Sequence, residues 1–176
     1  MKKTLSIIAV LVFTVIFSNQ ATAQEFDPLD KSPLDVARFP YSYRTSDKVV
    51  KVTYSRPQLK GRTVAKLAPS GKKWRLGANE ATEITFYKDV NFGGKDVKAG
   101  TYTMYAIPGE KEWIVAISSQ LNVWGAYFHK DENDIARVTV PVTKADKTFE
   151  EFTMAFGDDM TMHMAWGDIL VSVPVK

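Results

Sequence analysis

The sequence predicts an all-β fold: a single domain built as an antiparallel two-layer sandwich or a flattened barrel. From Val50 onward, apolar residues recur at every second position, which is the spacing of strands that bury one face. Turn-forming stretches such as Asn91–Gly94, Pro108–Gly109 and Gly157–Asp159 separate these runs. The runs follow one another about every 8–12 residues, a rhythm typical of sandwiches and barrels.

The alternating runs define the expected strands, and stretches with helical spacing are rare. The expected strands are Val50–Tyr54, Glu83–Phe86, Tyr102–Ala106, Trp113–Ile117, Arg137–Val142, Phe152–Phe156, Met160–Trp166 and Ile169–Val175. Residues 24–46 contain Pro28, Pro33 and Pro40, so we expect an irregular or edge-lying lead-in there. The β domain is expected to occupy residues 47–176.

The N-terminus has the features of a cleavable signal peptide over residues 1–23. Lys2 and Lys3 precede an apolar run from Leu5 to Phe17, and Ala21-Thr22-Ala23 supplies the small residues of a cleavage site. The apolar run is shorter than the roughly 20 residues that a membrane-spanning helix needs. We therefore expect cleavage after Ala23, export to the periplasm or beyond, and no transmembrane segment in the mature chain.

The composition narrows the classes of function. Because the chain has no cysteine, disulfides, thiolate nucleophiles and thiolate metal ligands are excluded. It has 23 Lys and Arg against 20 Asp and Glu, and two of the lysines belong to the expected signal peptide. A nearly neutral domain without a clustered basic face argues against nucleic acid as a partner. The chain has two histidines, too few for a three-histidine zinc site, and we expect no metal and no cofactor.

Several short segments occur in a characteristic order along the chain. They are Tyr54-Ser55-Arg56-Pro57, Trp74-Arg75-Leu76-Gly77-Ala78-Asn79-Glu80-Ala81-Thr82, Ala99-Gly100-Thr101-Tyr102, Trp124-Gly125-Ala126-Tyr127 and Asp134-Ile135-Ala136-Arg137. From about Ser32 to the C-terminus the chain resembles an uncharacterised exported bacterial family, domain of unknown function 2911. The resemblance implies an exported, all-β single domain found mostly in Gram-negative bacteria, and it implies no established reaction or ligand.

The segment Trp74–Thr82 is the strongest candidate for a site. It places an aromatic ring, a guanidinium, an amide and a carboxylate beside a glycine just before a strand, and function concentrates in loops at strand ends. The residues expected to bind a ligand are Trp74, Arg75, Asn79 and Glu80, joined by Arg56, Trp124 and Tyr127. The competing interpretation is structural: Arg75 and Glu80 pair with each other, or with Arg56, Arg62 or Asp134, and only fix the loop.

These residues favour three functions. The leading one is a binding module for a glycan or a small carboxylate, because aromatic rings beside polar groups suit both. The first alternative is a periplasmic enzyme that uses Glu80 as general acid or base, with Arg75 stabilising negative charge. No nucleophile elbow, phosphate loop or dinucleotide fingerprint is present, which favours binding over catalysis. The second alternative is a structural envelope protein that binds another protein through an open sheet edge.

A second polar stretch, at residues 124–134, holds His129 and three carboxylates. Hard cations such as calcium bind oxygen-rich loops, but the spacing differs from the calcium loop, so a solvated turn is expected. Asp134 and Arg137 are expected to form a pair that meets the Arg75 cluster.

A third stretch, at residues 160–164, alternates methionine with Thr161 and His163. Thioethers and imidazole are suitable ligands for copper. On a strand, however, the methionines face one way and His163 the other, so they cannot converge on one ion. We expect the methionines to form a core stripe that continues to Trp166.

Overall fold

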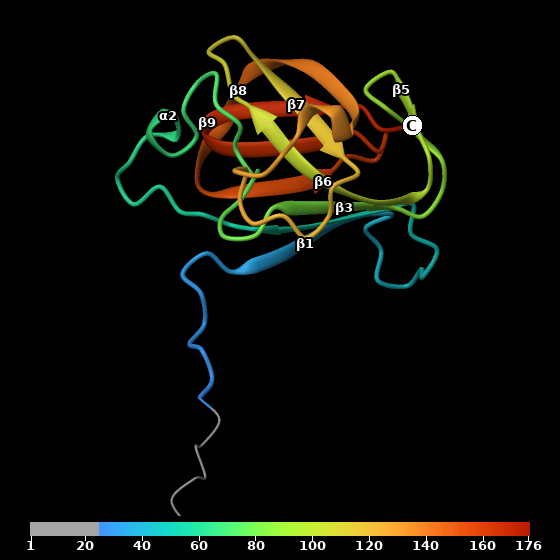
Figure 1. The fold of residues 1–176 in the computed structure, drawn as a ribbon, viewed down its shortest axis with the longest axis horizontal. Coiled ribbons are helices and arrows are strands. Elements are labelled where there is room, and N and C mark those ends of the chain that lie inside the picture. The colour runs from blue at the N-terminus through green and yellow to red at the C-terminus, as the bar shows by residue number, and fades with distance from the viewer. Residues whose placement is uncertain (1–24) are drawn as a thin grey trace, which may run out of the picture.

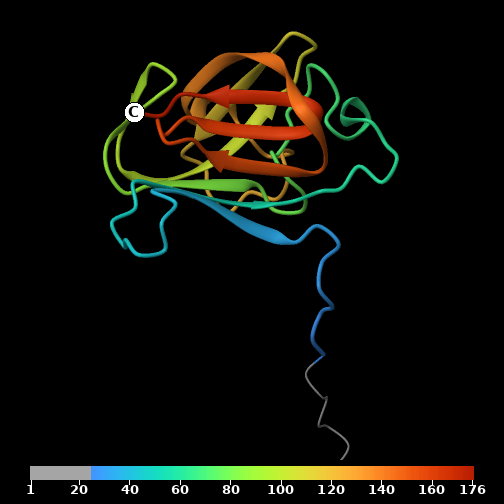
Figure 2. The same ribbon diagram turned by 180° about the vertical axis from the view of Figure 1, so that it is seen from behind.

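The strands form one large and one small antiparallel sheet. The computed structural model describes residues 25–176, so the expected signal peptide lies outside the described residues. Within that range, the large sheet has the order β1-β2-β3-β6-β7-β8-β9 and curls into a half-barrel, while β4 and β5 form a separate hairpin (Figures 1 and 2). The all-β single domain predicted from the sequence is confirmed.

Strands make up almost all of the regular structure in residues 25–176. They are β1 (Leu34–Phe39), β2 (Val50–Ser55), β3 (Thr82–Phe86), β4 (Val90–Phe92), β5 (Lys95–Val97), β6 (Gly100–Ile107), β7 (Glu112–Ser118), β8 (Asp134–Phe156) and β9 (Met162–Val173). A single-turn helix, α2 (Val64–Leu67), follows β2, and a 3-10 turn at Asp131–Asn133 precedes β8. None of the described helices has the length and apolar character needed to span a membrane.

The two-residue period reflects burial on one face of each strand. In β2, Val50, Val52 and Tyr54 are at most 2% exposed, whereas Lys51 and Thr53 are only partly buried. The residues expected to point inward on β3 and β7 are buried in the same way. The hydrophobic effect therefore fixes which face of each strand lines the interior.

Contacts between the segment after β2 and strand β8 hold the sheet in its curled form. Residues just after β2 pair with the second half of the long strand β8 through a bridge between Gln58 and Glu151. Two backbone hydrogen bonds flank that bridge, from Leu59 N to Glu150 O and from Phe152 N to Pro57 O, both 3.0 Å long. These contacts return β8 to the first strands and enclose the core.

Aromatic rings fill the middle of the half-barrel. Trp74 stacks on Trp166 with ring centroids 5.2 Å apart. Its ring also meets the edges of Trp113 at 5.7 Å and Phe152 at 4.9 Å. Because these residues come from the loop before β3 and from β7, β8 and β9, this cluster joins distant parts of the sequence.

Part of the N-terminal lead-in forms a regular strand. Residues 34–39 form β1, which pairs with β2 from Leu34–Ser55 to Phe39–Val50 and is the outermost strand of the sheet. The lead-in was expected to be either irregular or at a sheet edge, and residues 34–39 lie at the edge. Pro33 and Pro40 flank the strand and do not interrupt it, since proline is tolerated at strand ends. Residues 25–33 contain no helix or strand and lead away from the body of the domain (Figure 1).

Candidate functional site

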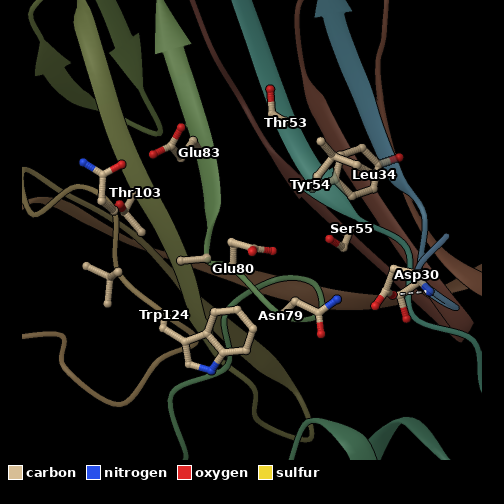
Figure 3. Close-up of a pocket in the computed structure, with 14 residues that line it drawn as sticks. Asp30, Leu34, Thr53, Tyr54, Ser55, Asn79, Glu80, Glu83, Thr103 and Trp124 are labelled. Atoms are coloured by element: carbon tan, nitrogen blue, oxygen red, sulfur yellow. Dashed lines mark hydrogen bonds between the residues drawn. The ribbon is translucent and has the colours of Figure 1, made fainter. Parts of the chain in front are cut away.

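A cleft of about 570 Å³ lies on the outer face of β2, β3 and β6 (Figure 3). Its floor comes from these strands and its walls from the lead-in and two loops. The lining residues are Asp30, Ser32, Leu34, Thr53, Tyr54, Ser55, Asn79, Glu80, Ala81, Glu83, Thr103, Asn122, Val123 and Trp124. Three of the residues expected to bind a ligand, Asn79, Glu80 and Trp124, are therefore brought together.

The register of the sheet places a row of polar residues across the cleft floor. Thr53 on β2 lies opposite Glu83 on β3, and Glu83 lies opposite Thr103 on β6. All three occupy the outward positions that alternate with core residues. The floor of the cleft therefore presents the Thr53 hydroxyl and the Glu83 carboxylate, whereas Thr103 is fully buried and its hydroxyl is bonded to the Gln120 carbonyl.

The loop from Trp74 to Thr82 is bent tightly against β2. Leu76 and Asn79 have positive φ angles of 52° and 61°, and the Thr82 hydroxyl donates to the Leu76 carbonyl at 2.7 Å. A Cβ atom at Gly77 would lie 3.1 Å from the Ser55 carbonyl oxygen, so glycine allows this close approach. The bend separates the loop into an inner half, with Trp74 and Leu76 buried, and an outer half at the cleft.

A second loop, residues 119–130, completes the wall. Its backbone bridges to the first loop at Glu80 and Trp124, and Ala81 N donates to Val123 O at 3.2 Å. Gln120 braces the loop from inside, because its amide donates to Phe128 O at 3.0 Å while its backbone carbonyl accepts from the Thr103 hydroxyl at 2.6 Å. These contacts place Trp124, which is 52% exposed, at the mouth of the cleft (Figure 3).

Carboxylates set the charge of the cleft. Asp30, Glu80 and Glu83 line it, whereas no lysine or arginine is among its lining residues. The Asp30 carboxylate accepts the backbone N–H of Ser32 at 2.6 Å. Within residues 25–176, neither Glu80 nor Glu83 forms an ion pair. The cleft therefore offers hydrogen-bond acceptors and a negative potential.

The structure separates Arg75 from Glu80. Arg75 is not a lining residue of the cleft; its Nη1 donates to the Asn79 carbonyl at 2.8 Å, and its guanidinium lies 5.9 Å from the centre of the Tyr127 ring. No ion pair joins Arg75 and Glu80 in the described part of the chain. The expectation that these two side chains act on each other is therefore not met.

Two other expected site residues lie elsewhere. Trp74 is 6% exposed and belongs to the aromatic core, so its ring does not face the cleft. Arg56 forms an ion pair with Asp35 at 3.1 Å, and its Nε donates to the Phe152 carbonyl at 3.3 Å. Arg56 thus joins β1 and β8 at the closure of the half-barrel and is not a lining residue of the cleft.

Several cleft residues were not expected from the sequence. The sequence did carry a signal for Glu83, Thr53 and Thr103, because each is a polar residue at an outward position of an alternating run. Their meeting depends on β6 pairing with β3 across the β4–β5 hairpin, which period alone does not reveal. Asp30 reaches the cleft only because β1 sets the direction of the lead-in.

A compact polar cluster occupies the outer face beside the cleft. Asp134 and Arg137 are 3.5 Å apart, as expected for a pair. The Tyr105 hydroxyl donates to Asp134 Oδ2 at 2.5 Å, and Lys73 forms an ion pair with Asp131. The pair therefore meets Tyr105 and Lys73, whereas the expected partner was the Arg75 cluster.

His129 closes this polar cluster from above. It is 9% exposed, and its ring packs on Tyr105 with centroids 4.8 Å apart, so it is a buried residue within the stretch 124–134, which is otherwise mostly exposed, as a solvated turn requires. Neither ring nitrogen has a hydrogen-bond partner among residues 25–176. Burial, and next the neighbouring Lys73, lower the pKa of His129, while burial and the hydrogen bond to Asp134 raise the pKa of Tyr105.

The methionine stretch takes the expected arrangement. Met162 and Met164 are at most 1% exposed and continue to the equally buried Trp166. His163 points the other way, with its Nδ1 2.8 Å from the Ser172 hydroxyl. Met160 lies just before β9 with a positive φ of 64° and packs against the edge of the core.

Comparison with known protein families places the chain among its relatives. The model of the family described as "Protein of unknown function (DUF2911)" matches residues 32–175. The chain belongs to the DUF2911 family. The matched range contains every lining residue of the cleft except Asp30, and it contains the complete large sheet. Comparisons with curated proteins and with solved structures found no match.

Proposed function

We propose that the protein is a binding module that holds a saccharide in the cleft beneath Trp124. The observation that carries the proposal is the pairing of a half-exposed indole with a row of hydrogen-bonding groups in a single cavity. Ligand sites of small molecules combine an apolar wall with a few convergent polar groups in this way.

The indole of Trp124 supplies the apolar wall. A tryptophan face is large, flat and rigid, so an aliphatic ring face that packs on it removes apolar area from water at little entropic cost. The backbone of Trp124 is fixed in position because it pairs with the backbone of Glu80. A sugar ring presents C–H groups on its faces and hydroxyls at its edge, which matches a wall of this kind beside polar groups.

The polar groups favour a neutral ligand rich in hydroxyls. Carboxylates accept hydrogen bonds only, whereas hydroxyls both donate and accept, so Glu80 and Glu83 suit the hydroxyl donors of a saccharide. Asn79 lines the same cleft and adds an amide. The hydrogen bonds that the Glu80 and Glu83 carboxylates accept are charge-assisted, so they are stronger than neutral ones and orient the ligand.

A small carboxylate fits the cleft poorly. Such a ligand would bring a negative charge next to three carboxylates, and like charges in a partly desolvated site repel. Arg75, the residue expected to hold it, does not line the cleft and is already bound to the Asn79 carbonyl. Of the two ligand classes expected from the sequence, the proposal keeps the glycan.

Neither alternative function gains a supporting observation. The enzyme hypothesis used Arg75 to stabilise negative charge beside Glu80, and Arg75 does not line the cleft that contains Glu80. The envelope-protein hypothesis required an open sheet edge; the large sheet ends in β1, which is short and carries Asp35 and Arg38, and in the longer β9, which carries His163 and Asp168. Charged residues on a short edge strand are a usual defence against strand pairing.

The place of action is also part of the proposal. We infer that the module works after export, on the strength of Lys2, Lys3, the apolar run Leu5–Phe17 and the small residues before Gln24. Expression of the full chain in a Gram-negative host, followed by cell fractionation and mass analysis, should find a periplasmic or secreted form that begins at Gln24. Recovery of an uncleaved cytoplasmic form would contradict this inference.

Binding is tested by titration calorimetry of the purified mature chain against cello-, chito-, xylo- and malto-oligosaccharides. We expect one of these series to bind, and Trp124→Ala to weaken that binding at least about 10-fold, since loss of an aromatic wall costs on the order of 1.4 kcal/mol or more. The matched control is Tyr87→Ala, which removes a 49% exposed ring outside the cleft and should leave affinity unchanged. Absence of binding in all four series, or equal binding by Trp124→Ala, would contradict the proposal.

A further inference from the structure

Tyr127 is an exposed aromatic residue that is nevertheless held in place. Its side chain is 74% exposed and lies outside the cleft, three residues beyond Trp124 on the same loop. The side chain of an exposed tyrosine normally rotates freely, whereas contacts restrict the side chain of Tyr127. The loop supplies two such contacts, one from Arg75 and one from Gly125.

Arg75 holds the Tyr127 ring electrostatically. Its guanidinium lies 5.9 Å from the ring centroid, within the range of a cation–π contact. The same guanidinium donates to the Asn79 carbonyl at 2.8 Å and forms no ion pair in residues 25–176. Arg75 therefore links the Tyr127 ring to the loop that carries the cleft residues Asn79 and Glu80.

Gly125 allows the ring to lie against the backbone. Its φ is 64°, and a Cβ atom there would lie 3.0 Å from Cδ2 and Cε2 of Tyr127 and 3.3 Å from Nη1 of Arg75. A larger residue would be strained at this φ, and its Cβ would require the Tyr127 ring and the Arg75 guanidinium to shift by a few tenths of an ångström. The turn thus sets two exposed aromatic rings, those of Trp124 and Tyr127, on Cα atoms at most about 11 Å apart.

We propose that Tyr127 is a second stacking platform and that the ligand is a saccharide chain of several units running from the cleft past Trp124 onto Tyr127. This inference rests on the proposed saccharide-binding function. The cleft is open at Trp124, because that indole lines it and is also half exposed. A chain that leaves the cleft there crosses exposed surface, and Tyr127 lies three residues along the same loop and is linked through Arg75 to the cleft residue Asn79.

The chemistry around the platform favours a saccharide chain over a protein partner. The cleft floor presents Thr53 and Glu83, which offer hydrogen-bonding groups where a protein partner would seek an apolar pocket for its central side chains. Arg75 beneath the ring adds a donor close to the path of the chain. Separated rings with polar groups between them match a ligand whose apolar ring faces repeat along a hydroxyl-rich chain.

The test is the dependence of affinity on chain length. Within the series that binds, wild-type protein should bind the hexasaccharide more tightly than the disaccharide by about 5- to 10-fold, the contribution of one further stacked ring. Tyr127→Ala should abolish that gain and leave disaccharide affinity unchanged. Arg75→Gln should reduce the gain about 2- to 3-fold, since it keeps a hydrogen-bond donor but removes the cation. Tyr87→Ala is the control for removal of an exposed ring elsewhere.

The outcomes separate this inference from the proposed function. If the disaccharide and hexasaccharide bind equally, or if Tyr127→Ala weakens both by the same factor, the second platform is refuted while binding in the cleft stands. If Tyr127→Ala has no effect at any length, the ring belongs to another contact, such as one with a protein. If wild-type protein binds none of the four oligosaccharide series, the inference fails together with the proposed function.

Discussion

The inner and outer faces of strands β2, β3 and β6 are made by the same backbone but obey different rules. The inner face carries residues such as Val52, Ile84 and Met104, all 0% exposed. The outer face carries Thr53, Glu83 and Thr103 in the same register. The difference teaches that burial determines the fold on one side, while the other side is free to carry chemistry, because its residues contribute little to the core.

Two tryptophans, Trp74 and Trp124, show the same difference between the faces in single residues. Trp74 contributes to the inner face through stacking on Trp166, whereas Trp124 stands over the outer face at the cleft mouth. The Tyr105 cluster is a third environment, since it lies on the outer face but is covered by the loop at residues 119–130. Predictions about these three environments can therefore break or sharpen the comparison.

The largest effect is expected on the inner face. Trp74→Ala removes a ring that is 6% exposed and should lower the free energy of unfolding by about 3–5 kcal/mol. Trp124→Ala removes a ring that is 52% exposed and should change it by less than about 0.5 kcal/mol. Urea unfolding of both variants measures the difference. Similar losses in the two variants would mean that the faces are not energetically distinct.

A smaller loss of stability is expected in the covered part of the outer face. Tyr105→Phe removes the donor to Asp134 Oδ2, and Oδ1 of the same carboxylate is buried without a partner. Loss of this hydrogen bond leaves Arg137 as the remaining partner of the buried carboxylate and should cost about 1–3 kcal/mol. Tyr102→Phe is the control, since its hydroxyl donates to the Lys98 carbonyl at an exposed position. Equal stability of the two variants in urea would show that the covered cluster contributes no more than surface polar groups.

A third prediction concerns the charge of the open part of the outer face. Glu83→Gln keeps the shape and an acceptor but removes one negative charge from the cleft. It should improve affinity for a saccharide containing glucuronic acid by about 5-fold relative to the neutral analogue, the effect of roughly 1 kcal/mol of repulsion. Glu112→Gln, at an exposed position outside the cleft, should leave this ratio unchanged. Calorimetry in low salt decides, and an unaltered ratio in Glu83→Gln would exclude electrostatic selection by the cleft.

The smallest expected effect is a pH dependence from His129. Burial and Lys73 lower its pKa in the folded protein, while Asp134 and Asp131 act in the opposite direction. The unfolded chain, with an ordinary histidine pKa of about 6.5, then binds a proton more readily than the folded chain. Stability should therefore be complete above pH 6.5 and decrease as the pH falls below that value.

The variant His129→Phe keeps a ring to pack on Tyr105 and should remove this decrease between about pH 6.5 and pH 5. His163→Gln, which replaces the other histidine, is the control and should retain the decrease. Thermal unfolding across this pH range provides the measurement. A wild-type protein whose stability is flat over the range would contradict the burial of an uncharged His129.

The sequence predicted the inner face well because burial leaves a local trace. Alternation at Val50–Tyr54 and the stripe from Met160 to Trp166 follow from the two-residue repeat of a strand, which is a property of neighbouring residues. The same rule applies to Trp74 and Leu76, two apolar residues that alternate with Arg75 and are both buried. This alternation was not used in the prediction, which placed Trp74 among the residues expected to bind a ligand.

The cleft could be predicted only in part, because it depends on contacts between distant segments. Asn79, Glu80 and Trp124 were expected together, and a backbone bridge between Glu80 and Trp124 brings them together. The positions of Arg75 and Asp30 depend instead on a positive φ at Leu76 and on the direction of β1. Neither leaves a periodic signal in the sequence, so geometry alone reveals which polar residues share a cavity.

The central claim is that Trp124 receives a saccharide ring while the interior remains undisturbed. The chain has four tryptophans, and Trp74, Trp113 and Trp166 are all buried. NMR spectra of nitrogen-15-labelled protein resolve the indole N–H of each, and they can be recorded during addition of the oligosaccharide series. The account predicts that the Trp124 signal moves progressively while the three buried indoles stay in place; a stationary Trp124 signal, or equal movement of all four, would contradict it.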